Sequence, residues 1–178
     1  RNPPSLPDDD ASSDMQQRIE EMLAAAGYQH YETSAFAQPN RRSRHNLNYW
    51  KFGDYLGIGA GAHSKLSFPD RIMRQARYKQ PQAYMQQVAK DAPIQIENEV
   101  GSDELGFEFM MNALRLNEGF DSVLFQERTS LSLLGVQREL DEAERRGLIF
   151  RDHQRIAPTK MGQRFLNDLL EIFLGEKT

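Results

Sequence analysis

Three glycines at alternate positions constrain the fold of this chain more than any other feature of its sequence. They are Gly57, Gly59 and Gly61, and they stand in the segment 54–63, which ends at His63. Because strand side chains alternate between two faces, this spacing predicts a strand with one face free of side chains. Such a face admits a ligand or another backbone closely, so we regard these glycines and His63 as candidate cofactor-binding residues.

The segment around these glycines carries an unusual local charge. Between Arg41 and Lys65 there are five basic residues and a single acid, Asp54, although the net charge of the whole chain is −4. The segment also holds the only tryptophan, Trp50, and two of the four histidines. This local balance predicts a site for an anionic ligand.

The overall composition is that of a globular chain. At 178 residues with a hydrophobic fraction of 39%, it can form one moderate domain or two small ones. The absence of cysteine excludes disulfides, thiolate metal sites and a cysteine nucleophile within the chain. We expect a soluble, cytoplasmic protein without a membrane span, and the start at Arg1 suggests the carboxyl-terminal piece of a longer protein.

The first part of the chain is predicted to be α/β. We expect a linker or loop over residues 1–11, then a helix that Ser13 caps, that packs through one apolar face and that ends at Gly27. A strand is expected over residues 28–36. The succession of helix and strand predicts parallel strands, and residues 12–100 are most simply explained as the end of a (β/α) barrel.

The last elements of this part are a hairpin, a helix and a strand. We expect the hairpin over residues 68–78, around Pro69 and Asp70, and the helix to begin at Pro81. Tyr84, Met85 and Val88 are expected to face inward from that helix. Alternation over residues 94–100 predicts the strand.

A domain boundary is expected near Gly101, followed by a winged-helix-like α+β domain over residues 101–178. Helices are predicted to begin at Asp103, Asp121 and Ser132, with a last helix capped by Thr159 and a hairpin between them. The side chains expected in the core of this domain are Phe107, Met110, Met111, Leu114, Leu133, Val136, Leu140, Ala143, Phe165, Leu166, Leu169, Ile172 and Phe173.

His45, Tyr49 and Trp50 form the second candidate site. Helical spacing would place His45 and Tyr49 on one face of a turn, with Trp50 beside them. A neutral imidazole can bind iron axially, the two rings can cover a porphyrin face, and nearby arginines can pair with propionates. A histidine that only forms hydrogen bonds in a loop is the alternative, and the spacing alone leaves it open.

Two other functions deserve comparison. The glycine spacing lacks the final glycine of a dinucleotide fingerprint, so close packing of the strand explains it as well as a ligand does. Between Arg145 and Arg164 six basic residues accompany one acid, Asp152, which suggests a winged-helix nucleic-acid-binding module. The preceding helix carries acids that would repel phosphate, so we disfavour nucleic acid as a partner.

Three motifs resemble the carboxyl-terminal half of a radical SAM family, namely the haem chaperones related to oxygen-independent coproporphyrinogen III oxidase. They are Tyr31-Glu-Thr-Ser-Ala-Phe-Ala37, Arg44-His-Asn-Leu-Asn-Tyr-Trp50 and Gly53-Asp-Tyr-Leu-Gly-Ile-Gly-Ala-Gly-Ala-His-Ser64. The later run from Phe107 to Leu116 fits the same family, so the resemblance covers nearly the whole chain. It implies a fragment of a partial radical SAM barrel, whose missing amino-terminal half holds a 4Fe-4S cluster on a CxxxCxxC loop and binds S-adenosylmethionine.

The resemblance also implies a haem site. The HNxxYW signature of the haem-binding branch stands here as His45, Asn46, Tyr49 and Trp50, with Arg44 beside it. We expect His45 to bind the iron of haem or another porphyrin, which then passes to a haem-requiring acceptor protein such as a respiratory enzyme. Oxidative decarboxylation of coproporphyrinogen III is the alternative that the family suggests.

One further expectation follows from the predicted loss of the barrel partner. Apolar surface around residues 28–36 or 56–62 would be exposed in the fragment, and exposed apolar surface favours self-association.

Overall fold

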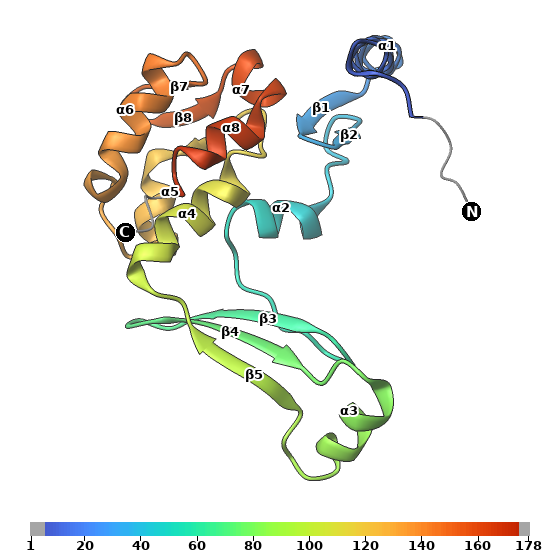
Figure 1. Cartoon of the computed structure of the whole chain (residues 1–178), viewed down its shortest axis with the longest axis vertical. Coiled ribbons are helices and arrows are strands. Elements are labelled where there is room, and N and C mark those ends of the chain that lie inside the picture. The colour runs from blue at the N-terminus through green and yellow to red at the C-terminus, as the bar shows by residue number, and fades with distance from the viewer. Residues whose placement is uncertain (1–5, 175–178) are drawn as a thin grey trace. The chain divides into compact units, whose positions relative to one another are not determined.

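The computed structural model describes residues 6–174, and the chain forms two compact units that divide between Ser43 and Arg44. The first unit contains helix α1 (Asp9–Ala25) and a hairpin of strands β1 (Gln29–Glu32) and β2 (Ala35–Ala37) (Figure 1). The predicted boundary near Gly101 is a different division and stays a prediction.

Helix α1 begins earlier than the sequence suggested. Asp8 is its cap, since its Oδ1 accepts a hydrogen bond from the backbone N–H of Ala11 at 2.8 Å. Acids at the first helical positions then complement the positive end of the helix dipole. The predicted cap at Ser13 is wrong, and the helix begins inside the segment 1–11 predicted as a linker, of which residues 1–5 lie outside the described range.

The apolar stripe of α1 is not buried in the structure. Met15, Ile19 and Met22 are each at least half exposed, and no described residue of the helix is buried. The prediction that this stripe packs is therefore wrong for the described residues. The remaining elements of its own unit form only a two-stranded hairpin.

The single strand predicted over residues 28–36 is in fact this β1–β2 hairpin. Glu32 stabilises the turn, because its Oε1 accepts a hydrogen bond from the N–H of Ser34 at 3.1 Å. Across the hairpin the rings of His30 and Phe36 stack with centroids 4.2 Å apart.

The second unit contains the remaining elements. In chain order they are α2 (Arg44–Trp50), β3 (His63–Ser67), β4 (Ile72–Arg77), α3 (Pro81–Val88), β5 (Ile94–Glu99), α4 (Ser102–Ala113), β6 (Phe120–Asp121), α5 (Ser122–Thr129), the 3₁₀-helix η1 (Leu133–Val136), α6 (Gln137–Arg145), β7 (Ile149–Arg151), β8 (Arg155–Pro158), α7 (Lys160–Arg164) and α8 (Leu166–Glu171).

All pairs among the described strands are antiparallel. One sheet has the order β3-β4-β5 and another the order β6-β8-β7. The turn expected around Pro69 and Asp70, the helix from Pro81 and the strand that follows it are confirmed, but the first strand of the hairpin, β3, precedes the expected range 68–78. The parallel pairing predicted for residues 12–100 is wrong within the described strands.

The glycine segment forms no strand. It is a loop, apart from an isolated bridge between Tyr55 and Lys65, and His63 begins strand β3 instead of ending a strand. The backbone φ angles of Gly59 and Gly61 are 105° and 72°, which lie outside the range of extended strands. The predicted glycine strand is therefore wrong.

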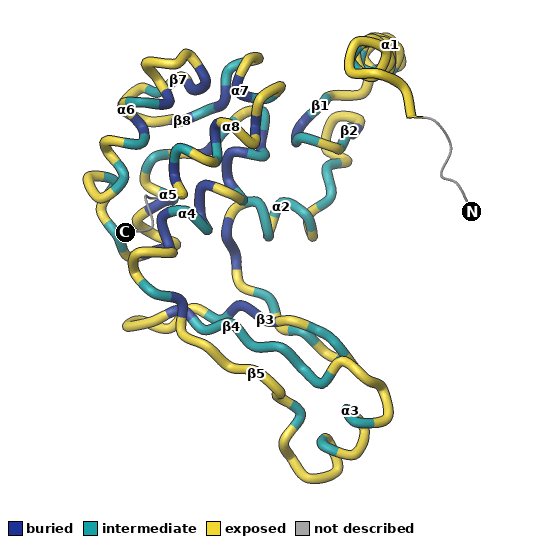
Figure 2. The backbone as a smooth tube through the Cα atoms, viewed as in Figure 1, coloured by how far each residue is buried: buried dark blue, intermediate teal, exposed yellow. Residues whose placement is uncertain are grey.

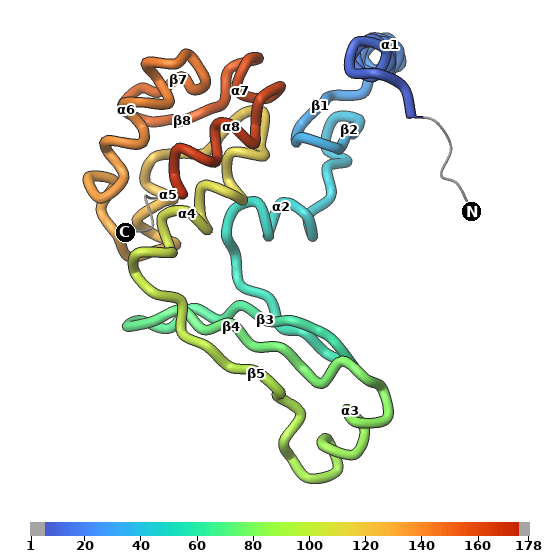
Figure 3. The backbone as a smooth tube through the Cα atoms, in the orientation of Figure 1, coloured from blue at the N-terminus to red at the C-terminus, as the bar shows by residue number. Residues whose placement is uncertain are grey.

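The core lies among the helices of the carboxyl-terminal part (Figure 2). Phe109 of α4 is fully buried and its ring contacts those of Phe52, Phe120 and Phe125, with centroids 5.7, 5.0 and 5.1 Å away. Helix α8, distant in sequence, lies beside α4 (Figure 3).

Several predicted helix faces need correction. Helix α4 buries Leu105, Phe109, Met110 and Ala113, whereas Met111 is 40% exposed. From α3, Met85 and Val88 are exposed and not inward.

The caps and the hairpin of the carboxyl-terminal part are confirmed. Ser132 and Thr159 each accept a backbone hydrogen bond as helix caps, and β7 pairs with β8. The last helix is broken at Phe165, which is 47% exposed and not in the core. The winged-helix description stays a prediction.

Candidate functional site

Helix α2 carries the predicted haem-site residues on the surface of the second unit. His45 and Tyr49 lie one turn apart, and the edge-to-face contact of their rings has centroids 4.9 Å apart at 72°. His45 and Arg44 are exposed, while Asn46, Tyr49 and Trp50 are half-buried. The imidazole is therefore accessible to a ligand from solvent.

The end of α2 is anchored in the core. Phe52 is 2% exposed and adopts a left-handed backbone with φ 54°, which turns the chain away from the helix and directs its ring onto Phe109. The Nδ2 of Asn48 donates to the carbonyl of Asp54 at 2.9 Å, and the N–H of Gly53 donates to the carbonyl of Asn48 at 2.7 Å. These bonds close the turn after the helix.

Lys65 ties this turn to strand β3. Its ammonium is buried and donates to the Phe52 carbonyl, to Oδ1 of Asp54 and to Oγ of Ser67, at 3.1, 2.9 and 3.0 Å. Burial lowers the pKa of Lys65, and the bond to Asp54 opposes that shift. The pKa of Asp54 lies below its usual value. Partial burial by itself raises this pKa, but hydrogen bonds from Ser67 and Lys65 to the carboxylate lower it by more.

A second set of side chains connects α2 with strand β4 and helix α4. The ring of Tyr49 contacts the ring of Tyr55 with centroids 4.4 Å apart. The hydroxyl of Tyr55 accepts a hydrogen bond from Nη1 of Arg74 at 2.7 Å, and Nη2 of Arg74 pairs with Glu108. Sequence reasoning missed Tyr55, Arg74 and Glu108, because contacts between residues 19 and 34 positions apart leave no local pattern.

Trp50 lies against a residue from the carboxyl-terminal part. The guanidinium of Arg115 lies 4.4 Å from the centroid of the Trp50 ring. The indole Nε1 of Trp50 is buried and has no hydrogen-bond partner within the described residues. A buried donor that makes no hydrogen bond typically costs about 1–3 kcal/mol.

Arg41 and Arg42, two basic residues close to α2 in sequence, belong to the first unit. Within that unit the Arg42 guanidinium lies 5.6 Å from the Tyr31 ring and donates to Gln29.

The backbone groups of the glycine segment already have partners. The N–H groups of Gly57, Gly59 and Gly61 donate to the Ser64 hydroxyl, the Tyr84 hydroxyl and the Tyr78 carbonyl, respectively. A Cβ at Gly57 would lie 2.2 Å from the His63 carbonyl oxygen. Gly57 thus packs closely against the chain itself, whereas a Cβ at Gly59 would meet nothing within 4 Å. The assignment of these glycines to a cofactor, with exposed His63, stays a prediction.

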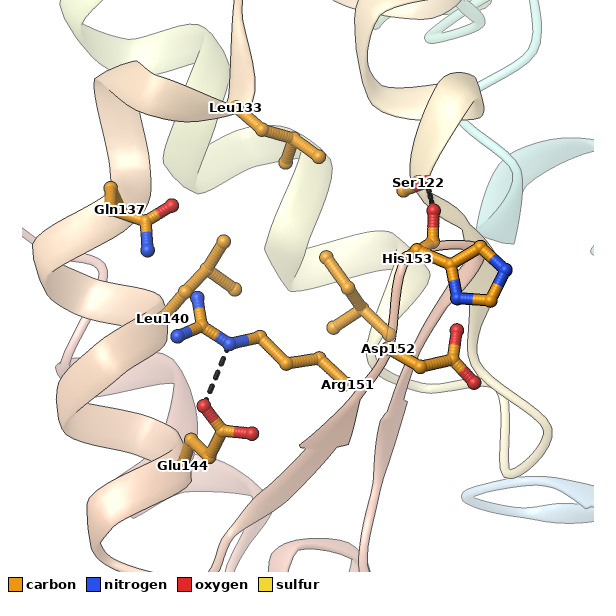
Figure 4. A pocket seen from close by; sticks show the side chains of 9 residues that line it. Ser122, Leu133, Gln137, Leu140, Glu144, Arg151, Asp152 and His153 are labelled. Carbon is orange, nitrogen blue, oxygen red and sulfur yellow. Dashed lines mark hydrogen bonds and ion pairs between the residues drawn. The ribbon is translucent and has the colours of Figure 1, made fainter.

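A separate cavity of about 400 Å³ lies between α6, η1 and the β7–β8 hairpin (Figure 4). Leu133, Leu140 and Ile156 supply its apolar wall, while Arg151 at its mouth bonds Glu144. The cavity contains none of the predicted site residues.

The basic run between Arg145 and Arg164 is largely paired with acids of the same domain. Arg145 and Arg146 bind Glu142 at 2.7 and 2.6 Å, Arg151 binds Asp141 and Glu144, and Arg155 lies 3.5 Å from Asp121. Nucleic-acid phosphates would have to compete with these carboxylates, which weakens the nucleic-acid alternative.

This pairing leads to a prediction about Glu142. Hydrogen bonds from Arg145 and Arg146 lower its pKa from 4.5 to about 2. A lowered pKa means that the carboxylate stabilises the fold above pH 4.5, and that this contribution disappears as the pH falls through about 2. Changing both arginines to glutamine should return the pKa toward 4.5, measured by NMR titration of the side-chain carboxyl carbon. Arg138→Gln, which leaves both partners intact, should not change it, and a value still near 2 in the double variant would refute the assignment.

Within residues 6–174, no group of three His, Cys, Asp or Glu residues is arranged to hold a metal ion. No helix in that range has both the length and the apolar character needed to cross a membrane.

Comparisons with known proteins agree with the motifs. Residues 101–165 match the model of the HemN C-terminal domain. The chain is 44% identical to the heme chaperone HemW of Escherichia coli (strain K12) over 175 residues, which cover 98% of this chain and 45% of that protein. It is 42% identical to HemW of Haemophilus influenzae over 176 residues, with the same shares covered.

The fold is also similar to a solved structure. Coproporphyrinogen III oxidase (HemN) from Escherichia coli, whose description calls it a radical SAM enzyme, aligns with a TM-score of 0.66 at 19% identity, covering 94% of this chain and 42% of that chain. This likeness shows a shared α/β fold. The chain spans about half the length of the curated relatives that it matches. Together these findings show that the chain is similar to the carboxyl-terminal part of HemW heme chaperones and that residues 101–165 match the HemN C-terminal domain.

Proposed function

We propose that this chain carries the haem-binding site of a haem chaperone, that His45 binds the haem iron, and that the haem then passes to an acceptor protein. The observation that carries this proposal is the exposed imidazole of His45 in edge contact with Tyr49, in a chain similar over 98% of its length to heme chaperones. The runner-up, oxidative decarboxylation of coproporphyrinogen III, has support from a fold likeness at 19% identity.

The groups around α2 fit a tetrapyrrole carried as cargo. A neutral imidazole is a common axial ligand of haem iron, and aromatic rings next to it can cover part of the macrocycle. Arg44 is exposed on the same helix, and a guanidinium of this kind is what a propionate carboxylate binds.

An exposed site suits a protein that transfers haem. His45 is exposed on α2 and would supply the axial ligand there. A single ligand on an open surface releases its cargo more readily than a closed pocket with two ligands would. Transfer to an acceptor thus requires only that the acceptor offer a stronger site.

The 4Fe-4S cluster and S-adenosylmethionine belong, in this proposal, to the other part of the full-length protein. This chain has no cysteine, so it cannot supply the thiolates that such a cluster needs. Its own contribution to the barrel is expected to be structural.

Haem titration of this chain tests the proposed site. Replacing His45 with alanine should weaken haem binding at least about tenfold and shift the Soret band, because the axial nitrogen is lost. His153→Ala is the matched control, since His153 is equally exposed but lies on the β7–β8 turn. Unchanged affinity and an unchanged Soret band in His45→Ala would rule out His45 as the ligand.

A further inference from the structure

We infer that Tyr55 and Arg74 are positioning residues of the haem site, which fix the ring of Tyr49 and through it the imidazole of His45. The inference rests on the proposed haem function and extends it to residues outside the HNxxYW signature. It starts from the contacts described above, in which His45 contacts Tyr49, Tyr49 contacts Tyr55, and Tyr55 accepts a hydrogen bond from Arg74.

Tyr55 is held on the backbone as well as by its side chain. Its N–H donates to the Lys65 carbonyl and its carbonyl accepts from the Lys65 N–H, both at 3.0 Å. These two bonds attach residue 55 to the edge of β3, whose next strand β4 carries Arg74. The backbone position of Tyr55 is therefore set by the sheet as well as by the turn that follows α2.

Arg74 fixes the outer end of the Tyr55 side chain. One terminal nitrogen donates to the hydroxyl of Tyr55, and the other pairs with Glu108 of α4. The side chains of Arg74 and Glu108 are 30% and 23% exposed, so the pair is partly shielded from water. Such a bond to a charged donor is stronger than a neutral one, and it restricts the direction of the Tyr55 ring.

The consequence for His45 is geometric. Helix α2 has seven residues, and its described side chains include none that is buried, so the helix alone does not fix the imidazole. The Tyr49 ring, contacted by Tyr55 on one side and His45 on the other, transmits the orientation set by the sheet. Groups that orient a metal-binding histidine typically affect affinity about 10–100-fold when they are lost.

The test compares four variants of the chain with wild type and with His45→Ala. Tyr55→Ala should weaken haem binding about tenfold and shift the Soret and EPR signatures of the axial ligand. Tyr55→Phe keeps the ring and should lose only about threefold, as should Arg74→Gln. Because the two side chains share the Tyr55–Arg74 hydrogen bond, the double variant Tyr55→Phe/Arg74→Gln should lose less than the two single losses combined. The matched control is Tyr78→Ala, a half-buried tyrosine outside this set of contacts.

The outcomes separate the inference from the proposed function. If His45→Ala weakens binding while Tyr55→Ala and Arg74→Gln bind haem with the wild-type affinity and spectrum, the haem site stands and the positioning role is wrong. If His45→Ala also binds normally, the proposed function itself fails. If Tyr55→Ala does not fold, judged by its thermal midpoint, the spectra of Tyr55→Phe and Arg74→Gln decide: a shifted ligand signature supports the role and a wild-type one overturns it.

Discussion

Replacing Gly57 with alanine is expected to lower the free energy of unfolding by about 3 kcal/mol. The new Cβ would lie 2.2 Å from the His63 carbonyl oxygen and within 2.8 Å of other His63 backbone atoms. The backbone of His63 cannot move aside as a flexible side chain can, so the loop or the start of β3 must shift. The hydrogen bond from Gly57 to Ser64 and the backbone bonds between Tyr55 and Lys65 must then weaken. Urea denaturation of the ligand-free chain measures the loss directly.

This experiment also distinguishes packing from cofactor binding. Gly135→Ala is the control, because a Cβ there meets nothing within 4 Å and its backbone needs no positive φ, so stability should change by less than about 1 kcal/mol. If Gly57→Ala unfolds at the wild-type urea concentration, the glycine does not serve packing, and the cofactor interpretation regains its support.

The glycines show why the sequence predicted this segment only in part. Alternate glycines do indicate close approach, and close approach is what Gly57 makes. The pattern cannot tell a strand face from a loop, since both need the same small residues. The positive φ angles at Gly59 and Gly61 then decide for a loop.

Local signals predicted that His45 and Tyr49 share one face of a helix, and they missed the long-range contacts around that helix. The spacing of His45 and Tyr49 was enough to place them on one face of α2. Arg74, Glu108 and Arg115 reach the site from β4, α4 and the segment after α4, and no local period encodes such contacts.

The error in α4 has a similar cause. A helical stripe fits the predicted set, Phe107, Met110, Met111 and Leu114, as well as it fits the residues that are buried in the structure. Helix α4 is apolar around much of its circumference, so periodicity alone does not determine which side of the helix faces the core. Packing against Phe52, Phe120 and Phe125 selects Phe109 as the central residue.

Phe109→Ala is expected to reduce the free energy of unfolding by about 4 kcal/mol. The side chain is fully buried and forms edge-to-face contacts with three other rings, so truncation removes both its burial and those contacts. Unfolding measured by urea, with near-ultraviolet circular dichroism as the probe of aromatic packing, should show the loss. Phe165→Ala removes the same atoms from a side chain that is 47% exposed and should cost clearly less.

The same variant tests a link between the core and the proposed haem site. Phe52 follows α2 directly and depends on Phe109 for its main aromatic contact, so a cavity at Phe109 frees the end of the helix that carries His45. In conditions where Phe109→Ala remains folded, haem affinity should therefore fall more than it does for Phe165→Ala. Equal affinities in the two variants would show that α2 keeps its position without the Phe52–Phe109 contact, and that the sheet contacts of Tyr55 and Lys65 are sufficient to hold it.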